Sequence, residues 1–321
     1  MQAYASDIDA AKALKTKIEE IRKAIGHVIV GQEDVVNKLI ISILCNGHSL
    51  LVGVPGLAKT LLVKTVADVL DLSFKRVQFT PDLMPSDITG AEILDESRQF
   101  KFIKGPVFAN IVLADEINRT PPKTQAALLE AMQERNITVG GALYKLPAPF
   151  FVLATQNPIE QEGTYPLPEA QLDRFMFMIT LDYPSFQEEV TIVRNTTGAM
   201  HQHLPKVMTA EEILHFQELV RRVPVPDNVL EYAVGLVHKT RPGAGNSVEE
   251  TKQYIAYGAG PRASQYLVLG AKCHALINGK YSPDIEDVQA MALPVLRHRV
   301  VRNYKAEAEG ITQEALIAKW L

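Results

Sequence analysis

Residues Ser49 to Thr60 read SLLVGVPGLAKT, an apolar run that leads into a turn with two glycines and then into a lysine and a threonine. A buried strand that feeds such a turn, with Lys59 and Thr60 at the start of a helix, is typical of a P-loop. In a P-loop the backbone N–H groups cradle phosphate oxygens, the lysine meets the β- and γ-phosphates, and the hydroxyl holds Mg²⁺. The stretch therefore predicts an α/β nucleotide-binding fold. A tight strand-to-helix turn with a surface lysine is the alternative.

Ala58 stands where the strict P-loop pattern has glycine, directly before the lysine. A methyl group is tolerated if the residue has helical backbone angles, because glycine is required only where φ is positive or the ligand leaves no room for a Cβ. The P-loop interpretation therefore expects helical backbone angles at Ala58.

A second apolar run, ANIVLADE from Ala109 to Glu116, ends abruptly in two carboxylates. Packing gives a buried strand no reason to end in this way. In a P-loop enzyme Asp115 would lie beside the magnesium ion that Thr60 also coordinates, and Glu116 would polarise the attacking water as general base. The alternative is an acidic pair that caps a helix starting near Pro121.

A third apolar run, from Phe150 to Thr155, leads into Gln156 and Asn157. A side-chain amide at the carboxyl edge of a parallel sheet can hydrogen-bond both the γ-phosphate and the hydrolytic water, because ligands of open α/β sheets bind at that edge. Asn157 precedes Pro158, so an ordinary turn explains it equally well.

Two arginines complete the candidate site. Arg174 starts the next apolar run, and Arg262 follows Pro261 in the first turn of a predicted helix. A guanidinium directed at the γ-phosphate stabilises the charge of phosphoryl transfer, and hydrolysis depends on assembly when a neighbouring subunit supplies it. The alternative is a surface salt bridge, for which Asp173 is the obvious partner of Arg174.

Taken together, these motifs resemble the MoxR family of AAA+ ATPases, which is related to the magnesium-chelatase ATPase subunit. The matching segments extend over nearly the whole chain and lie at residues 30–32, 53–60, 114–119, 154–158, 167–175 and 260–264. Alanine at position 58 is similar to the usual form of this family.

The resemblance implies a role for each candidate residue. It implies that ATP is bound by the P-loop residues Gly53, Val54, Pro55, Gly56, Leu57, Ala58, Lys59, Thr60 and Leu61, with Gly31 and Gln32 at the adenine pocket. It assigns Mg²⁺ to Thr60 and Asp115, with Glu116 as the catalytic base. It further implies that Asn157 is sensor 1, that Arg174 is an arginine finger offered to the adjacent subunit, and that Arg262 is sensor 2.

The pattern of apolar segments predicts two domains. Strands at residues 49–54, 75–79, 110–114, 151–155 and 175–181 alternate with helical segments, which predicts a parallel five-stranded sheet covered on both faces. After residue 184 only amphipathic helices are expected, at residues 211–222, 228–238, 262–278 and 285–302. We therefore expect an AAA+ α/β core over residues 1–184 and a smaller all-helical lid over residues 185–321.

Two insertions shared with the family are expected in the core, at about residues 88–104 and 136–147. Gly140 and Gly141 between β-prone runs predict a hairpin in the second one. The resemblance implies a homo-oligomer, a hexameric ring, whose insertions contact a client protein. It also implies clients with von Willebrand factor A domains and a role in metal insertion or complex assembly.

Composition separates the competing functions. A nucleic-acid motor would use Arg98, Lys101 and Lys104 of the first insertion, but a net charge of −4 and a pI near 6.1 speak against nucleic acid as a partner. A nucleotide switch that does not hydrolyse ATP would need neither Glu116 nor Arg174. No apolar stretch approaches the roughly 20 residues of a membrane span and no secretory signal pattern begins the chain, so a cytoplasmic location is expected.

Overall fold

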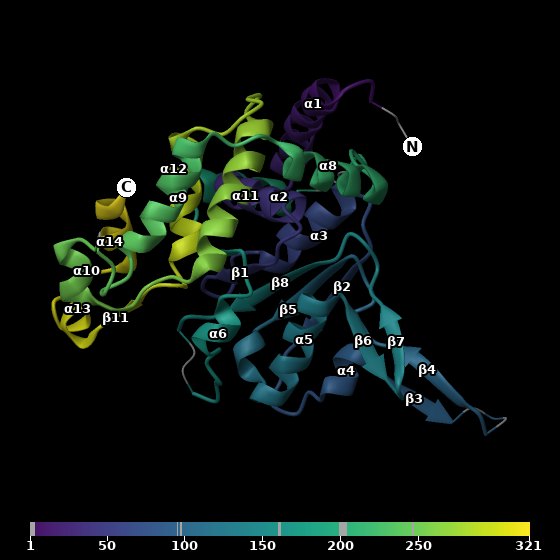
Figure 1. Cartoon of the computed structure of the whole chain (residues 1–321). Coiled ribbons are helices and arrows are strands. Elements are labelled where there is room, and N and C mark those ends of the chain that lie inside the picture. Colours follow the sequence, from purple (N-terminus) through teal and green to yellow (C-terminus); the bar gives the residue numbers. More distant parts are fainter. Residues whose placement is uncertain (1–3, 95, 97, 160–161, 199–203, 246) are drawn as a thin grey trace. The chain divides into compact units, whose positions relative to one another are not determined.

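The computed structural model describes residues 4–94, 96, 98–159, 162–198, 204–245 and 247–321 (Figure 1). It divides into two compact units, each made of separate segments of the chain. The sheet unit comprises Lys17–Leu167 and Ile179–Leu214, and the helical unit comprises Met1–Thr16, Pro168–Met178 and His215–Leu321. Residues 185–214 thus group with the sheet, whereas the domain boundary after residue 184 stays a prediction.

The predicted parallel sheet is confirmed. Its five strands run in the order β2 (Phe74–Gln78), β5 (Ile111–Asp115), β8 (Phe151–Gln156), β1 (Ser49–Val52) and β9 (Phe177–Thr180). Residues 111–114 are fully buried, as expected for a central strand covered on both faces. Ala114 lies opposite Ala154, and Leu51 lies opposite Thr155. The carboxyl ends of β5, β8 and β1 therefore meet at one edge of the sheet.

Among the described residues, eight helices precede, connect or follow the strands of the sheet. They are α1 (Asp7–Gly26), α2 (Glu33–Leu44), α3 (Lys59–Val69), α4 (Pro85–Thr89), α5 (Pro122–Glu134), α6 (Glu169–Leu172), α7 (Phe186–Thr196) and α8 (Ala210–Arg222), with α1 and α8 crossing a unit boundary and α6 in the helical unit. Helix α3 contacts β5, and α4 packs beside α5 (Figure 1). The N-cap of α5 is Pro121, so the acidic pair at residues 115 and 116 does not cap it.

Both expected insertions fold as antiparallel hairpins. The first pairs β3 (Gly90–Leu94) with β4 (Phe100–Lys104), and the second pairs β6 (Asn136–Val139) with β7 (Ala142–Lys145). The rings of Phe102 and Tyr144 stack with centroids 4.1 Å apart. The two hairpins therefore lie side by side and form one projecting arm of the sheet unit (Figure 1).

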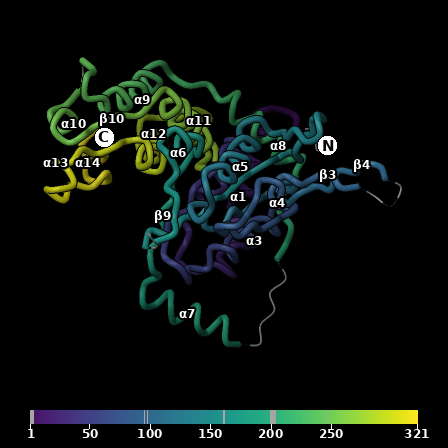
Figure 2. Tube along the Cα trace, turned by 90° about the horizontal axis from the view of Figure 1, so that it is seen from below, coloured from purple at the N-terminus to yellow at the C-terminus, as the bar shows by residue number. Residues whose placement is uncertain are grey.

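The predicted helical lid is confirmed, and it also contains a short pair of strands. Figure 2 shows its helices gathered in one group: α9 (Asp227–Lys239), α10 (Glu249–Tyr254), α11 (Pro261–Ile277), α12 (Ile285–Leu296), α13 (Tyr304–Ala308) and α14 (Gln313–Trp320). A short antiparallel pair, β10 (Ile255–Tyr257) and β11 (Val301–Arg302), accompanies them. The predicted helix over residues 285–302 was therefore too long, because the chain leaves the helix after Leu296 to pair with β10.

Within the described ranges, no helix is long and apolar enough to cross a membrane.

Candidate functional site

The turn between β1 and α3 has the close contacts that a P-loop needs. A Cβ atom on Gly53 would lie 3.0 Å from Cβ and 3.1 Å from the carbonyl oxygen of Leu181, so the neighbouring chain leaves little room for a side chain. Gly56 has φ +87°, in the region that favours glycine. The loop backbone is thus shaped by glycine at both positions.

Ala58 departs from the expectation. It is the N-cap of α3, and its φ of +52° and ψ of 29° are left-handed, not right-handed helical. Left-handed angles bring Cβ close to a carbonyl oxygen and cost an alanine about 1–2 kcal/mol. The sequence could not reveal this, because the angle is set by how the loop enters the helix and not by Ala58 itself.

Lys59 is directed back over the loop. Its Nζ donates a hydrogen bond of 2.5 Å to the carbonyl oxygen of Gly53. Partial burial lowers the pKa of Lys59, while the nearby carboxylates of Asp115 and Glu116 oppose that shift. The lysine of the P-loop and the two carboxylates at the end of β5 therefore share one electrostatic environment.

Asp115 is held by two donors from neighbouring strands. The Thr155 hydroxyl donates to Oδ1 at 2.6 Å, and Arg76 of β2 donates to Oδ2 through Nε at 3.0 Å and Nη2 at 2.7 Å. The carboxylate is mostly buried, whereas about half of the Arg76 side chain is exposed. Both carboxylate oxygens of Asp115 thus have a partner in this structure.

Glu116 lies just beyond the strand with left-handed backbone angles, φ +58° and ψ 51°. Its N–H donates to the Thr155 hydroxyl at 2.8 Å. Its Oε2 accepts hydrogen bonds from Gln78 Nε2 at 2.9 Å and from Arg119 Nη1 at 3.3 Å. The carboxylate of the candidate base is therefore held beside the end of β2.

Three residues of this arrangement were missed from the sequence: Thr155, Arg76 and Gln78. The available signal was that Thr155 is a polar residue near the end of a buried strand, whereas β2 is largely exposed, so that polar side chains on it give no such signal. Gln78 lies directly opposite Asp115 in the β2–β5 register. Its relevance becomes visible only when the strand order is known.

The residues expected to hold Mg²⁺ fit that ion in chemistry. A carboxylate and a hydroxyl are hard oxygen ligands, and Mg²⁺ is commonly held by one or two protein groups together with substrate phosphates. In the described parts of the chain, no cluster of three or more acidic, cysteine or histidine side chains forms a cage for a metal. Thr60 and Asp115 would therefore hold Mg²⁺ only together with phosphates, and Arg76 competes for Asp115.

Asn157 follows β8 and is buried. Its Oδ1 accepts a hydrogen bond of 3.2 Å from the N–H of Ile159, which is the local turn contact that the sequence left open. The NH₂ group is the donor that a phosphate or a water would use. The turn contact and the proposed sensor role thus use different atoms of the same side chain.

Gly31 and Gln32 lie at the start of α2. Gly31 has φ +75°, and a Cβ there would lie 2.4 Å from the carboxylate carbon of Glu188. Gln32 is the N-cap of α2. Flanking residues Ile29 and Glu33 line a cavity of about 290 Å³ between α1 and α2. Neither Gly31 nor Gln32 lines that cavity, and their place at an adenine pocket stays a prediction.

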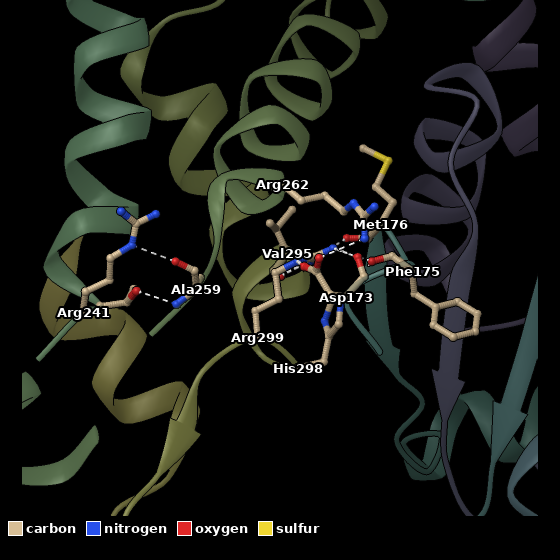
Figure 3. A network of polar contacts seen from close by, with 10 residues as sticks. Asp173, Phe175, Met176, Arg241, Ala259, Arg262, Val295, His298 and Arg299 are labelled. Atoms are coloured by element: carbon tan, nitrogen blue, oxygen red, sulfur yellow. Dashed lines mark hydrogen bonds and ion pairs between the residues drawn. The ribbon is translucent and has the colours of Figure 1, made fainter. Parts of the chain in front are cut away.

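Arg174 and Arg262 belong to the helical unit. The salt bridge of Arg174 with Asp173, which was the alternative interpretation of Arg174, is not formed. Instead, Asp173 accepts hydrogen bonds from Arg262 Nη1 at 3.0 Å and from Arg299 Nε at 2.8 Å (Figure 3). Arg299 reaches Asp173 from 126 residues further along the chain, a distance over which sequence patterns give no signal.

Comparison with known proteins identifies the family. The family described as "ATPase family associated with various cellular activities (AAA)" matches residues 48–177, and the AAA lid domain matches residues 249–320. The chain is 42% identical to the protein named Chaperone MoxR1 of Mycobacterium tuberculosis, over 99% of this chain and 85% of that protein. It is 28% identical to Protein MoxR of Paracoccus denitrificans, over 94% and 92% of the two chains.

A solved structure agrees with these relatives. A protein of Cytophaga hutchinsonii, provisionally named an ATPase, is 44% identical and superposes with a TM-score of 0.91, covering 97% of this chain and 95% of that one. The P-loop, the carboxylate-ended strand and the lid are thus found together with near full-length similarity. The chain belongs to the MoxR family of AAA+ ATPases.

Proposed function

We propose that this protein is a Mg²⁺-dependent ATPase that forms a ring and remodels or activates a partner protein. The observation that carries the proposal is the meeting of Lys59, Asp115 and Glu116 at the carboxyl edge of the sheet, where the Thr155 hydroxyl joins the Asp115 carboxylate to the backbone N–H of Glu116. This edge is where open α/β sheets bind their ligands.

Each residue at this edge has a separate role in the proposed hydrolysis. The loop N–H groups and Lys59 would bind the β- and γ-phosphates, and Thr60 and Asp115 would hold Mg²⁺, which would supply positive charge beside those phosphates. Glu116 takes a proton from the attacking water, for which Oε1 is the available oxygen, because Gln78 and Arg119 both donate to Oε2. Asn157 orients the same water or the γ-phosphate.

The second part of the proposal concerns assembly. Among the residues that the structure describes, the partly exposed Arg174 guanidinium has neither a hydrogen bond nor an ion pair. A charged group without a local partner suits the role of an arginine finger for the nucleotide of an adjacent copy. We therefore propose a homo-oligomeric ring, hexameric as in the family expectation, with Arg262 as the sensor of the nucleotide in the lid.

The third part concerns the client. The projecting arm formed by the two hairpins exposes large apolar side chains, with Phe100 73% and Leu94 61% exposed on paired positions. Exposed apolar patches of this kind mark sites of protein contact. We propose that the arm contacts the client, which the family resemblance suggests to be a protein with a von Willebrand factor A domain undergoing metal insertion or complex assembly. A cytoplasmic location and the absence of nucleic-acid binding stay predictions.

The proposal is tested by ATP hydrolysis of the wild type beside Glu116→Gln and Lys59→Ala. Removal of the base is expected to slow hydrolysis at least about a hundredfold while ATP binding stays close to normal. Lys59→Ala is expected to weaken ATP binding itself, which separates the two roles. Hydrolysis by Glu116→Gln at the wild-type rate would contradict the assignment, and a wild type that ignores ATP with Mg²⁺ would remove the ATPase proposal altogether.

A further inference from the structure

One buried side chain, that of Arg299, binds the chain on both sides of Arg174. Arg299 has 1% of its side chain exposed and donates hydrogen bonds to four backbone carbonyls as well as to the Asp173 carboxylate. Those carbonyl oxygens belong to Asp173 at 2.9 Å, Phe175 at 2.6 Å, Met176 at 3.2 Å and Val295 at 2.5 Å (Figure 3). Three of the four lie in the turn between α6 and β9 that contains Arg174.

A neighbouring side chain adds to this attachment. His298 Nε2 donates to the same Phe175 carbonyl oxygen at 3.0 Å. Burial and the adjacent Arg299 hold the pKa of His298 well below its usual range, so the ring is neutral. The Phe175 carbonyl therefore has two donors from the loop after α12.

Arg174 thus lies between two fixed peptide groups. The carbonyls on either side of it, at Asp173 and Phe175, are both bound by Arg299. The Asp173 carboxylate, the nearest negative charge along the chain, is used by Arg262 and Arg299 on its two oxygens. The described part of the chain consequently gives Arg174 a rigid backbone but no counter-ion.

The two arginines on Asp173 differ in how firmly they are held. Arg299 is buried and has hydrogen bonds to several carbonyls, and removing one partner from a buried charged group is strongly unfavourable. Arg262 has 40% of its side chain exposed, and within the described residues its guanidinium makes one polar contact, the hydrogen bond to Asp173 Oδ2. Arg262 can therefore leave Asp173 for another anion, whereas Arg299 cannot leave without exposing buried carbonyls.

We propose that Arg299 and Asp173 are positioning residues for Arg174, which keep its guanidinium available to a phosphate group bound by an adjacent copy of the chain. Arg299 acts by fixing the backbone on both sides of Arg174. Asp173 acts by joining Arg299 to Arg262, so that departure of Arg262 toward a nucleotide changes the charge directly beside Arg174. This inference rests on the proposed ATPase function and adds two residues to it.

The test uses Asp173→Asn, which keeps the size of the side chain and removes its charge. The matched control is Asp284→Asn, at the N-cap of α12, where the carboxylate is 67% exposed and pairs with Lys280. The control is expected to hydrolyse ATP at the wild-type rate. For Asp173→Asn we expect kcat to fall at least about tenfold with KM for ATP within about twofold, because positioning acts on the transition state and not on ATP binding.

Two further measurements distinguish positioning from a merely structural role. If Asp173 acts through Arg174, the double variant Asp173→Asn with Arg174→Ala is no slower than Arg174→Ala alone. In mixed oligomers with Glu116→Gln, Asp173→Asn subunits should regain activity, because their intact pockets then receive an intact arginine from the neighbour. The inference would be overturned if the fold-reductions in kcat of the two single variants multiplied in the double variant. It would also be overturned if confirmed mixed oligomers showed no recovery of activity.

Arg299→Lys provides a second test, because lysine keeps the charge beside Asp173 and loses the planar fork that binds several carbonyls. The same fall in kcat and the same recovery on mixing are expected. If neither variant unfolds cooperatively or binds ATP, the network is structural and the inference is wrong. Wild type without hydrolysis would overturn the proposed function and this inference together, whereas hydrolysis that depends on Glu116 but not on Asp173 or Arg299 would overturn this inference alone.

Discussion

Thr155 donates a hydrogen bond of 2.6 Å to Asp115, and the same hydroxyl accepts one of 2.8 Å from the N–H of Glu116. One buried side chain on β8 therefore orients the carboxylate that we propose to bind Mg²⁺ and fixes the left-handed backbone of the candidate base. Thr155→Val should lower the free energy of unfolding by about 1–3 kcal/mol, because a buried acceptor and a buried N–H both lose their partner. It should also slow ATP hydrolysis.

Thr155→Ser is the control for this change. It keeps the hydroxyl and removes a methyl group, so it should cost about 1 kcal/mol and keep most of the activity. Urea unfolding and steady-state hydrolysis of the two variants measure both effects. Equal activity of the Val and Ser variants would show that the hydroxyl does not position the carboxylates.

Arg76 is expected to compete with Mg²⁺ for Asp115. Its guanidinium occupies Oδ2 through two hydrogen bonds. Arg76→Gln removes that cation, so half-maximal ATPase activity should require at least about twofold less Mg²⁺. A Mg²⁺ titration at saturating ATP measures the change. An unchanged or higher Mg²⁺ requirement would indicate that Asp115 is not a ligand of the ion.

Ala58 should gain stability on replacement by glycine. Its φ of +52° costs alanine about 1–2 kcal/mol, while glycine loses about 0.5–1 kcal/mol through the greater freedom of the unfolded chain. Ala58→Gly should therefore raise the free energy of unfolding by about 0.5 kcal/mol. The matched control is Ala126→Gly, at an exposed position inside α5, which should lower it by about 1 kcal/mol. Destabilisation by both substitutions would contradict the left-handed angle at Ala58.

Stability should fall as the pH is lowered below about 6.5, because two buried histidines resist protonation. Burial and Arg135 lower the pKa of His48 from 6.5 to about 3, and the pKa of His298 is also well below its usual range. His48 donates to the Met132 carbonyl oxygen and accepts from the Val152 N–H, which requires a neutral ring. Because these pKa values are lower in the folded state, the unfolded chain binds more protons between pH 6.5 and 3.

Each histidine then contributes stability that is present above pH 6.5 and lost at up to about 1.4 kcal/mol per pH unit as the pH falls toward the folded pKa. Urea unfolding between pH 7.5 and 5 measures this slope. The His48→Gln variant should be less stable than the wild type at every pH. The slope of its free energy of unfolding against pH should correspond to the uptake of nearly one proton fewer on unfolding. An unchanged slope would mean that His48 is already accessible to protons in the folded protein.

The stacked rings of the arm should be energetically coupled. A double-mutant cycle with Phe102→Leu and Tyr144→Leu should give a coupling energy of about 0.5–1.5 kcal/mol, the usual scale for an aromatic pair. Thermal or urea unfolding of the four proteins supplies the cycle. Additive losses would mean that the hairpins fold without supporting one another.

The sheet and the candidate site could be predicted from the sequence to different extents. The strands were found because continuous apolar runs mark parallel strands, and the runs that end in Asp115 and Asn157 marked the functional edge. The predictions of the backbone angles at Ala58 and of the end of the helix that became α12 were wrong. Both features depend on the path of the following chain and not on local residue preference.

Side-chain partners were the least predictable part. The alternative interpretation of Arg174 paired it with its sequence neighbour Asp173, yet the partners of Asp173 are Arg262 and Arg299, 89 and 126 residues away. Local spacing carries no information about such contacts, which arise only when helices of the lid have folded. The resemblance to a family named the roles of Arg174 and Arg262 but gave no signal for Arg299.

The stacking of Phe102 on Tyr144 also bears on how movement is transmitted through the protein. The second hairpin continues through residues 146–150 directly into β8, the strand that ends beside Thr155 and Asn157. A displacement of either hairpin is therefore shared with the other and can reach the end of β8 along a single strand. We expect from this continuity that contact of a client with the arm and ATP hydrolysis influence each other.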